Sequence, residues 1–519
     1  MGRHRRTVIA LIATAAVLLP LGWFWKASLL PGSYSVMDMG YADYGGGSAP
    51  RDVLAGHDDD MRGMTPGRSV ATLTAATDRV ADVSVTLTAR TQRFRLTPGR
   101  DFDGYTLNGT SPGPEIRAVQ GQLVQVRLVN ESVPDGITLH WHGLDVPNAE
   151  DGVAGVTQDA VPVGGSFTYR FVVGQAGTFW YHSHQVSHDQ VLRGLFGPLV
   201  ITPLAHTPEP NGSKASDGSA VAAPVLDELA LVHLYGGVRT VNGHPGDVHV
   251  AGSPGVRVRV RVINTDNGPM SAWVTGAAYS LVAVDGTDLH GPTPVTDTAV
   301  TVTAGGRADL EVQMPADGSA VRVELGGNAA LVLGPARPAD ATGTNAASRA
   351  GAKPKRTLDL LTYGTPAPLG FDPTKAERHF TYAIGRQAGF LRGRPGIWWT
   401  INGHLFPDVP MFVVAEGDVV RMRIDNHSGE VHPMHLHGHH AVVISRNEVA
   451  STGSPWWIDS LNVADGENYD IAFVADNPGI WMDHCHNLTH PAQGLVTHLM
   501  YEGVTEPFRV GGSADNQPE

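Results

Sequence analysis

The chain has 519 residues, of which 42% are hydrophobic and 17% are charged, and its formal net charge is −14 at pH 7. This length allows several globular domains, and the acidic balance argues against nucleic acid or an anionic surface as a partner. The single cysteine excludes an intrachain disulfide.

An apolar run lies near the start of the sequence. Arg3, Arg5 and Arg6 precede Thr7–Trp25, a stretch without a charged side chain, and Lys26 follows it. About 20 apolar residues can cross a bilayer, whereas a cleaved signal has a shorter apolar core and an A-x-A-like site, which this stretch lacks. We therefore expect residues 1–30 to form a membrane anchor, with a cleaved signal as the alternative. The basic residues predict that the rest of the chain lies outside the cytoplasm.

Residues 31–69 are expected to be a flexible tether. Between Gly45 and Arg68 the Gly, Pro and Asp content is too high to bury a core. The run Asp58-Asp59-Asp60-Met61, with Met64, is a candidate metal-sampling segment, although acidic runs are more often solvated surface.

Beyond the tether the chain contains an internal repeat. Its first copy comprises Asn108-Gly109, Gly121, Asn130 and His140-Trp141-His142-Gly143, and its second comprises Asn402-Gly403, Gly417, Asn426 and His435-Leu436-His437-Gly438. A third copy has Asn242-Gly243, Gly255 and Asn264 without histidine pairs. The middle unit is therefore expected to be metal-free.

Each repeat is predicted to be all-β. Gln122–Val129, Val256–Ile263 and Asp418–Ile424 alternate apolar and polar side chains, which is typical of half-buried strands that form β-sandwiches. Two Ala-, Gly-, Ser- and Pro-rich linkers, Thr207–Ala223 and Arg337–Lys355, separate the units. We expect domains at residues 70–205, 224–340 and 356–508.

Four histidine pairs of the form H-x-H are the strongest chemical signal. They are His140 and His142, His182 and His184, His435 and His437, and His484 and His486. On an extended strand both imidazoles of a pair point to one face, and neutral imidazole is a good copper ligand. One such pair is expected by chance among 24 histidines, but four are not.

The only cysteine lies between two of these histidines, in His484-Cys485-His486. Because alternate residues face opposite sides of a strand, the histidines can bind one metal site and Cys485 another. With His432 and His490, Cys485 completes the His₂Cys set of a blue-copper centre. The total is eleven candidate ligands in two connected sets.

These residues resemble the motifs of the multicopper oxidase family, over about Val83 to Val504. His432-Pro433-Met434-His435-Leu436-His437 and His484-Cys485-His486-Asn487-Leu488-Thr489-His490 match its two C-terminal motifs closely. The resemblance implies three cupredoxin-like Greek-key β-sandwich domains and four coppers per chain. It assigns His432, Cys485 and His490 to a type 1 copper and His140 and His435 to a type 2 copper. The type 3 pair takes His142, His182, His184, His437, His484 and His486.

The resemblance also implies roles for three neighbouring positions. Leu495 occupies the axial position of the type 1 site, and a leucine there implies a comparatively high potential. Asp151 corresponds to an acidic residue near the type 2 copper and is a candidate proton relay, although Asp-Gly is also a common turn. Pro491 stands where several bacterial relatives have a carboxylate, so proton delivery on that side is unsupported.

The implied reaction takes single electrons from a reducing substrate near the exposed edge of His432 and passes them through Cys485 to His484 and His486, where dioxygen is reduced to water. Phenol oxidation, as in laccases, is the first choice, with Trp456-Trp457 as a candidate platform. Oxidation of ferrous or cuprous ions is the alternative, with Asp459, Asp465 and Glu467 as candidate carboxylates.

Two other classes are weaker alternatives. A copper nitrite reductase has no use for four complete histidine pairs. A non-catalytic copper-binding protein on the same scaffold is the second, but copper-free relatives of the fold lose ligands that are all present here.

Overall fold

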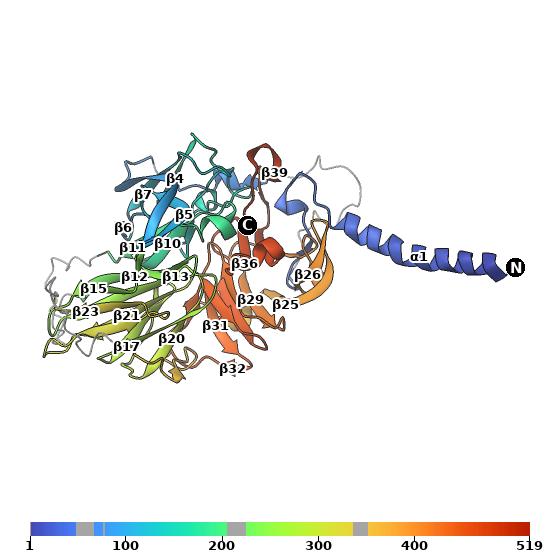
Figure 1. Cartoon of the computed structure of the whole chain (residues 1–519). Helices are drawn as coiled ribbons and strands as arrows, with labels where there is room; N and C mark the ends of the chain where they lie inside the picture. Colours follow the sequence, from blue (N-terminus) through green and yellow to red (C-terminus); the bar gives the residue numbers. More distant parts are fainter. Residues whose placement is uncertain (1, 48–66, 76–77, 205–224, 336–350) are drawn as a thin grey trace.

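The computed structural model describes residues 2–47, 67–75, 78–204, 225–335 and 351–519. Its six larger β-sheets form three pairs that follow one another along the chain, two further sheets have two strands each, and an N-terminal helix projects away from the sandwiches (Figure 1). The prediction of an all-β protein preceded by an apolar helix is confirmed. The run Asp58–Met64 and most of the two linkers lie outside the described residues.

The first sandwich has two four-stranded sheets. One has the order β5 (Arg100–Leu107), β4 (Val83–Thr97), β7 (Leu123–Asn130) and β9 (Ser166–Val172). The other has the order β6 (Ile116–Val119), β11 (Phe196–Thr202), β10 (Gly177–His182) and β8 (His140–His142). Apolar side chains from both sheets, including Leu87, Trp141 and Leu199, form its core.

The second sandwich has a seven-stranded and a six-stranded sheet. The first has the order β14 (His244–Pro245), β13 (Val238–Val241), β12 (Val225–Tyr235), β16 (Arg257–Asn264), β21 (Arg307–Gln313), β18 (Tyr279–Val284) and β19 (Thr287–Asp288). The other has the order β15 (Asp247–Ala251), β23 (Ala330–Gly334), β22 (Val321–Glu324), β17 (Met270–Thr275), β20 (Thr298–Val302) and β24 (Arg356–Thr357). Residues 356–363 contact two sandwiches, because β24 pairs with β20 and Tyr363 is buried in the second core, whereas Leu361 is buried in the core of the third.

The third sandwich has an eight-stranded and a six-stranded sheet. The first has the order β27 (His404–Leu405), β26 (Arg394–Ile401), β25 (Arg378–Leu391), β29 (Val419–Asn426), β35 (Asn468–Val474), β31 (Ala441–Arg446) and β32 (Val449–Ala450), and β33 (Trp457–Ile458) also pairs with β31. The other has the order β2 (Tyr41–Asp43), β28 (Pro410–Val414), β37 (Val496–Tyr501), β36 (Ile480–Cys485), β30 (His432–Leu436) and β34 (Ser460–Val463).

The internal repeat corresponds to one strand arrangement used three times. The long strands β4, β12 and β25 each pair antiparallel with the next strand and parallel with β7, β16 and β29 respectively. An Asn-Gly turn occurs in each copy, and Asn108, Asn242 and Asn402 all have φ between 52° and 55°. Their side-chain amides bond backbone groups of the long strand, which explains why asparagine recurs at a left-handed position.

The remaining elements are short, apart from the N-terminal helix. They are α1 (Gly2–Ala27), α2 (Ser187–Gln190), β1 (Ser33–Tyr34), β3 (Arg68–Ser69), β38 (Val504–Thr505), β39 (Val510–Gly511), and the 3₁₀ turns η1 (Val36–Asp38), η2 (Val70–Thr72), η3 (Asn148–Glu150), η5 (Pro373–Lys375), η6 (Pro491–Gln493) and η7 (Gly512–Ala514). Within α1, His4–Ala27 has a mean hydropathy of 2.1 and is long and apolar enough to cross a membrane. The most apolar part of this helix is not buried against the rest of the protein, so α1 is not a core helix.

The described part of the expected tether is not free. Residues 33–34 pair with β39, residues 41–43 pair in parallel with β28, and Val36 and Met39 are buried in the core of the third sandwich. The prediction of a flexible segment from residue 31 was therefore wrong for residues 33–43. Apolar side chains spaced among polar ones gave too weak a local pattern to reveal an edge strand that is completed by a distant part of the chain.

Candidate metal centres

Strand register brings the four histidine pairs together. In the first sandwich β10 pairs with β8 so that His182 lies opposite His140. In the third, β30 pairs with β36 so that His435 lies opposite His484. Directly opposed residues have Cβ atoms about 5 Å apart, so each sheet presents its histidines as a compact group. The second member of three pairs lies just beyond the end of its strand.

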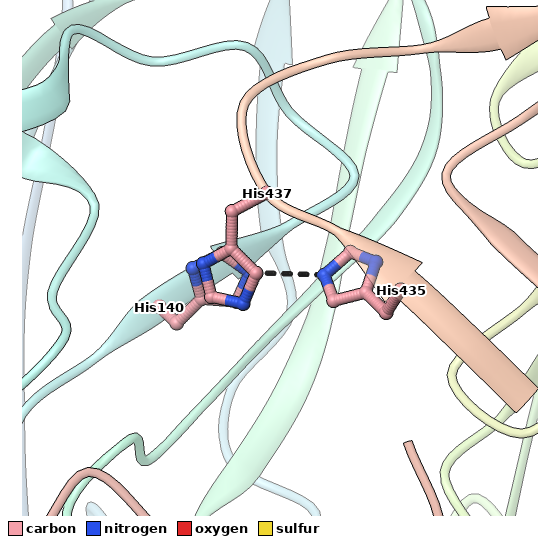
Figure 2. Close-up of side chains that lie close together, drawn as sticks. All are labelled: His140, His435 and His437. Atoms are coloured by element: carbon pink, nitrogen blue, oxygen red, sulfur yellow. Dashed lines mark hydrogen bonds between the residues drawn. The ribbon is translucent and has the colours of Figure 1, made fainter. Parts of the chain in front are cut away.

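The two groups meet between the first and third sandwiches as one buried cluster of eight imidazoles. The His140 and His435 Nε2 atoms are 3.5 Å apart, and the His140 ring stacks on that of His437 at 3.8 Å (Figure 2). The His437 and His484 Nε2 atoms are 3.2 Å apart. Candidate donor atoms of His140, His142 and His182 lie within 4.8 Å of one another, as do those of His184, His437 and His484.

The hydrogen bonds of these rings leave one nitrogen of most histidines facing the cluster. The Nδ1–H groups of His182, His435 and His484 donate to backbone carbonyls, of Ser183, Asp459 and Cys485 respectively. His142 is reversed, since its Nε2 contacts Ser460 Oγ at 3.1 Å and its Nδ1 is free. Such contacts fix the tautomer and orientation of a metal-binding imidazole.

Several ring nitrogens of the eight-imidazole cluster have no hydrogen-bond partner. They are His142 Nδ1, His182 Nε2, and both nitrogens of His184 and His486. An unpaired buried polar atom costs about 1–3 kcal/mol, so a cluster of them is unfavourable unless another group uses their lone pairs. Metal ions fit this donor set, and an all-imidazole environment suits copper.

Burial keeps these imidazoles neutral. It lowers the pKa of His142, His182, His435, His437 and His484 well below the usual value, and neighbouring histidines add to the effect. For the same reasons the pKa values of His184 and His486 fall to about 3. Neutral imidazole is the form that binds a metal.

A second donor set lies on the other face of the same strands. Cys485 Sγ is 3.5 Å from His432 Nδ1 and 3.4 Å from His490 Nδ1, and the two Nδ1 atoms are 3.1 Å apart. This converging His₂Cys arrangement is the donor set of a blue-copper site. Cys485 and Leu495 are both buried in the core of the third sandwich, and the Leu495 carbonyl accepts the Cys485 N–H at 3.3 Å.

The substrate-facing edge of this set differs from the expectation. His432 is fully buried, its Nε2 lies 2.7 Å from Ser428 Oγ, and its ring packs against Trp399, with ring centres 4.7 Å apart. His490 is 5% exposed and is the more accessible ring. The expectation that a substrate approaches at His432 was therefore wrong. Trp399, which covers this ring, belongs to the β25–β26 hairpin, and no pattern in the neighbouring sequence indicates that this hairpin packs over β30.

Asp151 lies beside the cluster. Its Oδ1 is 3.0 Å from His140 Nδ1 and its Oδ2 is 3.0 Å from His437 Nδ1. It also precedes Gly152, whose φ is +76° and whose hydrogen in place of a Cβ lets it pack on the Leu139 carbonyl. The turn interpretation and the contact with two histidines therefore both apply to this position.

The carboxylates and tryptophans suggested as substrate groups lie elsewhere. Asp459 contacts the eight-histidine cluster, with Oδ1 3.2 Å from His142 Nε2. Asp465 and Glu467 accept backbone N–H groups of Gly429 and Ala464. Trp456 packs on Tyr469 and Trp457 on Phe371. Proximity in sequence therefore misplaced Asp459, because it immediately precedes β34, which pairs with the histidine-bearing strand β30.

Four further residues border the two donor sets and were missed from the sequence. Glu430 Oε2 is 3.7 Å from His490 Nε2, and its carboxylate pairs with Arg386. Glu519 Oε1 is 3.6 Å from His484 Nδ1, and Arg307 pairs with Asp459. Glu430 could have been noticed two residues before His432, but the others are far from any ligand in the sequence.

Comparison with known proteins places the chain among copper oxidases. Two family models described as "Multicopper oxidase" match residues 89–206 and 372–503. Laccase-1 of Botryotinia fuckeliana is 29% identical over 462 residues, covering 79% of this chain and 80% of that protein. Multicopper oxidase MmcO of Mycobacterium tuberculosis is 28% identical over 469 residues, covering 81% and 87%. The crystal structure of a multi-copper oxidase from Pseudomonas thermotolerans has a TM-score of 0.62 and 26% identity, covering 80% and 98%.

Proposed function

This chain belongs to the multicopper oxidase family and is a copper oxidoreductase, and we propose that it oxidises phenols one electron at a time and reduces dioxygen to water. The observation that carries this proposal is the joining of a His₂Cys set to an eight-histidine cluster by one tripeptide, His484-Cys485-His486. Bound copper would supply the one-electron redox chemistry and the binding of dioxygen.

We assign four coppers to these donors. His432, Cys485 and His490 would hold the type 1 ion, with Leu495 as a non-coordinating axial neighbour, and His140 and His435 would hold the type 2 ion. The type 3 ions would take His142, His182, His184, His437, His484 and His486. Ring contacts support a division of these six, since His486 lies beside His142 and His182, whereas His184, His437 and His484 form a second group.

Two features of the chain serve electron and proton movement. The backbone of the tripeptide is the covalent connection between the two donor sets, so Cys485 and its flanking histidines need no further bridging residue. Asp151 accepts the His140 Nδ1–H with its backbone carbonyl and the His437 Nδ1–H with its carboxylate, and it is buried beside them. We assign it the proton-relay role on the type 2 side.

The surroundings of His490 favour a phenol over a metal ion as reductant. Among the described residues, Glu430 places a carboxylate against this ring, and Arg386 neutralises the charge of that carboxylate. The Arg386 guanidinium in turn lies 4.1 Å from the centre of the Trp399 ring. A cationic substrate would meet no net negative charge here, whereas an aromatic ring would meet an aromatic and cationic surface.

Oxidation of ferrous or cuprous ions is the second candidate. It is favoured by the position of Glu430, whose side chain is half exposed and could turn from Arg386 toward an incoming cation.

We also propose that α1 stays attached as an anchor, which leaves the three sandwiches outside the cytoplasm.

The test is a spectrum and a copper count on the air-oxidised protein, followed by oxygen uptake with a phenol, ferrous iron and cuprous copper. We expect blue absorption, four coppers per chain and fastest uptake with the phenol. Faster uptake with ferrous iron that is lost in Glu430→Gln would instead support a metal oxidase. A colourless protein without oxygen uptake would contradict both.

A further inference from the structure

The end of α1 is hydrogen-bonded directly to the third sandwich. The Trp25 Nε1–H donates to the Gly393 carbonyl at 3.1 Å, and the Ser28 hydroxyl accepts the Gly393 N–H at 3.1 Å. Gly393 forms the turn between β25 and β26, and a Cβ there would lie 2.9 Å from Leu29. Leu30, Tyr34, Val36, Met37 and Met39 pack in or against the core of the third sandwich. The last turn of α1 is therefore fixed to the tip of the β25–β26 hairpin.

The end of α1 has the composition of a membrane interface. Trp23, Phe24 and Trp25 are all exposed and are followed by Lys26. Tryptophan and other aromatic side chains collect at the headgroup level of transmembrane helices, and lysine extends toward water there. If α1 spans a bilayer, Gly393 must lie within a few ångströms of its surface, since the helix rises only about 1.5 Å per residue.

The hairpin carries side chains that suit this position. Residues 387–398 include Arg392 and Arg394 and no acidic residue, although the whole chain has a net charge of −14. Ile397 on β26 is 72% exposed. Between α1 and this edge of the sheet lies a cleft of about 730 Å³ lined by Trp23, Phe24, Phe390 and Leu405. Exposed apolar groups among arginines are typical of surfaces that enter the headgroup region.

The same hairpin covers the His₂Cys set. Trp399 is six residues after Gly393, so the two residues are about 20 Å apart along the strand. Its ring packs on His490, with ring centres 4.5 Å apart, and its Nε1–H donates to Gln493 beside that histidine. Whatever fixes the hairpin against a surface therefore also fixes the distance of this copper site from that surface.

We propose that the β25–β26 hairpin docks on the phospholipid bilayer beside α1 and holds the site of His432, Cys485 and His490 close to the membrane surface. The inference rests on the proposed retention of α1 as an anchor. It goes beyond anchoring, because a tethered oxidase could rotate freely whereas a docked one presents a single face to the lipid.

The test uses the full, copper-loaded chain in phosphatidylcholine vesicles. Cys485 is completely buried, so Ile397→Cys introduces the accessible thiol for an environment-sensitive fluorophore. Val449→Cys is the matched control, because Val449 is 59% exposed on β32 at the opposite edge of the same sheet. Retained blue absorption shows that each variant is folded.

We expect the label at residue 397 to shift to shorter wavelength on reconstitution and to be quenched by nitroxide-bearing lipids, while the label at 449 remains in water. Equal, water-like behaviour at both positions would overturn the docking proposal. Alkaline carbonate extraction distinguishes the docking proposal from the anchor proposal. Protein that stays in the vesicles with a water-exposed label at residue 397 contradicts docking alone. Protein lost from the vesicles contradicts both docking and the anchor, while the oxygen-uptake assay still tests the oxidase.

Discussion

Arg307 and Asp459 form a buried ion pair across the contact between the second and third sandwiches, with Nη1 2.7 Å from Oδ1. Asp459 in turn contacts His142, and its backbone carbonyl accepts the His435 Nδ1–H at 2.8 Å. The second sandwich, which contributes no candidate ligand among its described residues, therefore holds two histidines of the cluster in place.

Replacing Arg307 should damage stability and the cluster together. Arg307→Met leaves Asp459 buried without its partner, a change that typically costs about 3–5 kcal/mol. We expect a lower melting temperature and loss of type 2 and type 3 copper signals, with the blue absorption retained. The control is Arg93→Met, which breaks an exposed pair with Asp103 and should cost less than about 1 kcal/mol. An Arg307 variant with normal type 2 and type 3 spectra would show that the pair does not position the histidines.

The two donor sets should be separable by mutation. Cys485→Ser removes the thiolate, so the blue absorption and substrate oxidation should disappear while three coppers per chain remain. His435→Gln should have the reciprocal effect, with blue absorption retained and the type 2 signal lost. Copper analysis and electron paramagnetic resonance check both, and a blue Cys485→Ser protein would refute the type 1 assignment.

Leu495 is predicted to set a high type 1 potential because leucine cannot coordinate. Leu495→Met has nearly conserved volume and adds a thioether, which as a weak axial ligand should lower the potential measured by redox titration. The control is Leu488→Met, another fully buried leucine near the tripeptide, which should leave the potential unchanged. An unaltered potential in Leu495→Met would mean that another residue is axial.

Asp151→Asn should slow dioxygen reduction without affecting the first electron transfer. The backbone carbonyl still accepts the His140 N–H and the amide oxygen can accept the His437 N–H, but the amide cannot exchange protons as a carboxylate does. Proton transfer by a positioned group contributes about 10²–10⁴-fold, so steady-state oxygen uptake should fall by at least about tenfold. Anaerobic reduction of the blue band by substrate should keep its wild-type rate. A parallel fall in both rates would point to structural damage instead.

Glu150 predicts a pH dependence of stability. Burial raises the pKa of this carboxyl to about 7, although the Arg170 N–H that it accepts opposes the shift. Between about pH 4.5 and 7 the folded protein keeps a proton that the unfolded chain has lost, so stability should fall as the pH rises, by about 3 kcal/mol at most. Glu150→Gln should flatten this part of the melting-temperature profile, whereas the surface control Glu131→Gln should not. An unchanged slope in Glu150→Gln would exclude this carboxyl as its source.

Local pattern was sufficient for the strands and the repeat. Asn-Gly turns, alternating side chains and the spacing of Asn130, Asn264 and Asn426 each depend on a few neighbouring residues, and all three copies fold with the same strand pairing. Each of these asparagines is buried and bonds carbonyls of its own turn and of a nearby strand. Their recurrence therefore reflects a backbone requirement, not a metal site.

Residue 31 onward shows where local pattern failed. The segment that seemed a tether is fixed because β2 completes a sheet whose next strand, β28, is several hundred residues away in sequence. Exposed and half-buried residues of an edge strand look like a loop until the partner strand is known.

The sequence by itself determined the chemistry of the candidate sites, because H-x-H and H-C-H spacing on extended strands fixes which side chains share a face. Only the tertiary structure decided how those faces are surrounded. It placed Asp459 and Arg307 behind the histidine cluster, covered His432 with Trp399, brought Glu430 and Arg386 to His490, and fixed α1 to Gly393. These contacts join residues far apart in the chain, and their geometry depends on how the sandwiches pack, which no periodicity within one strand encodes.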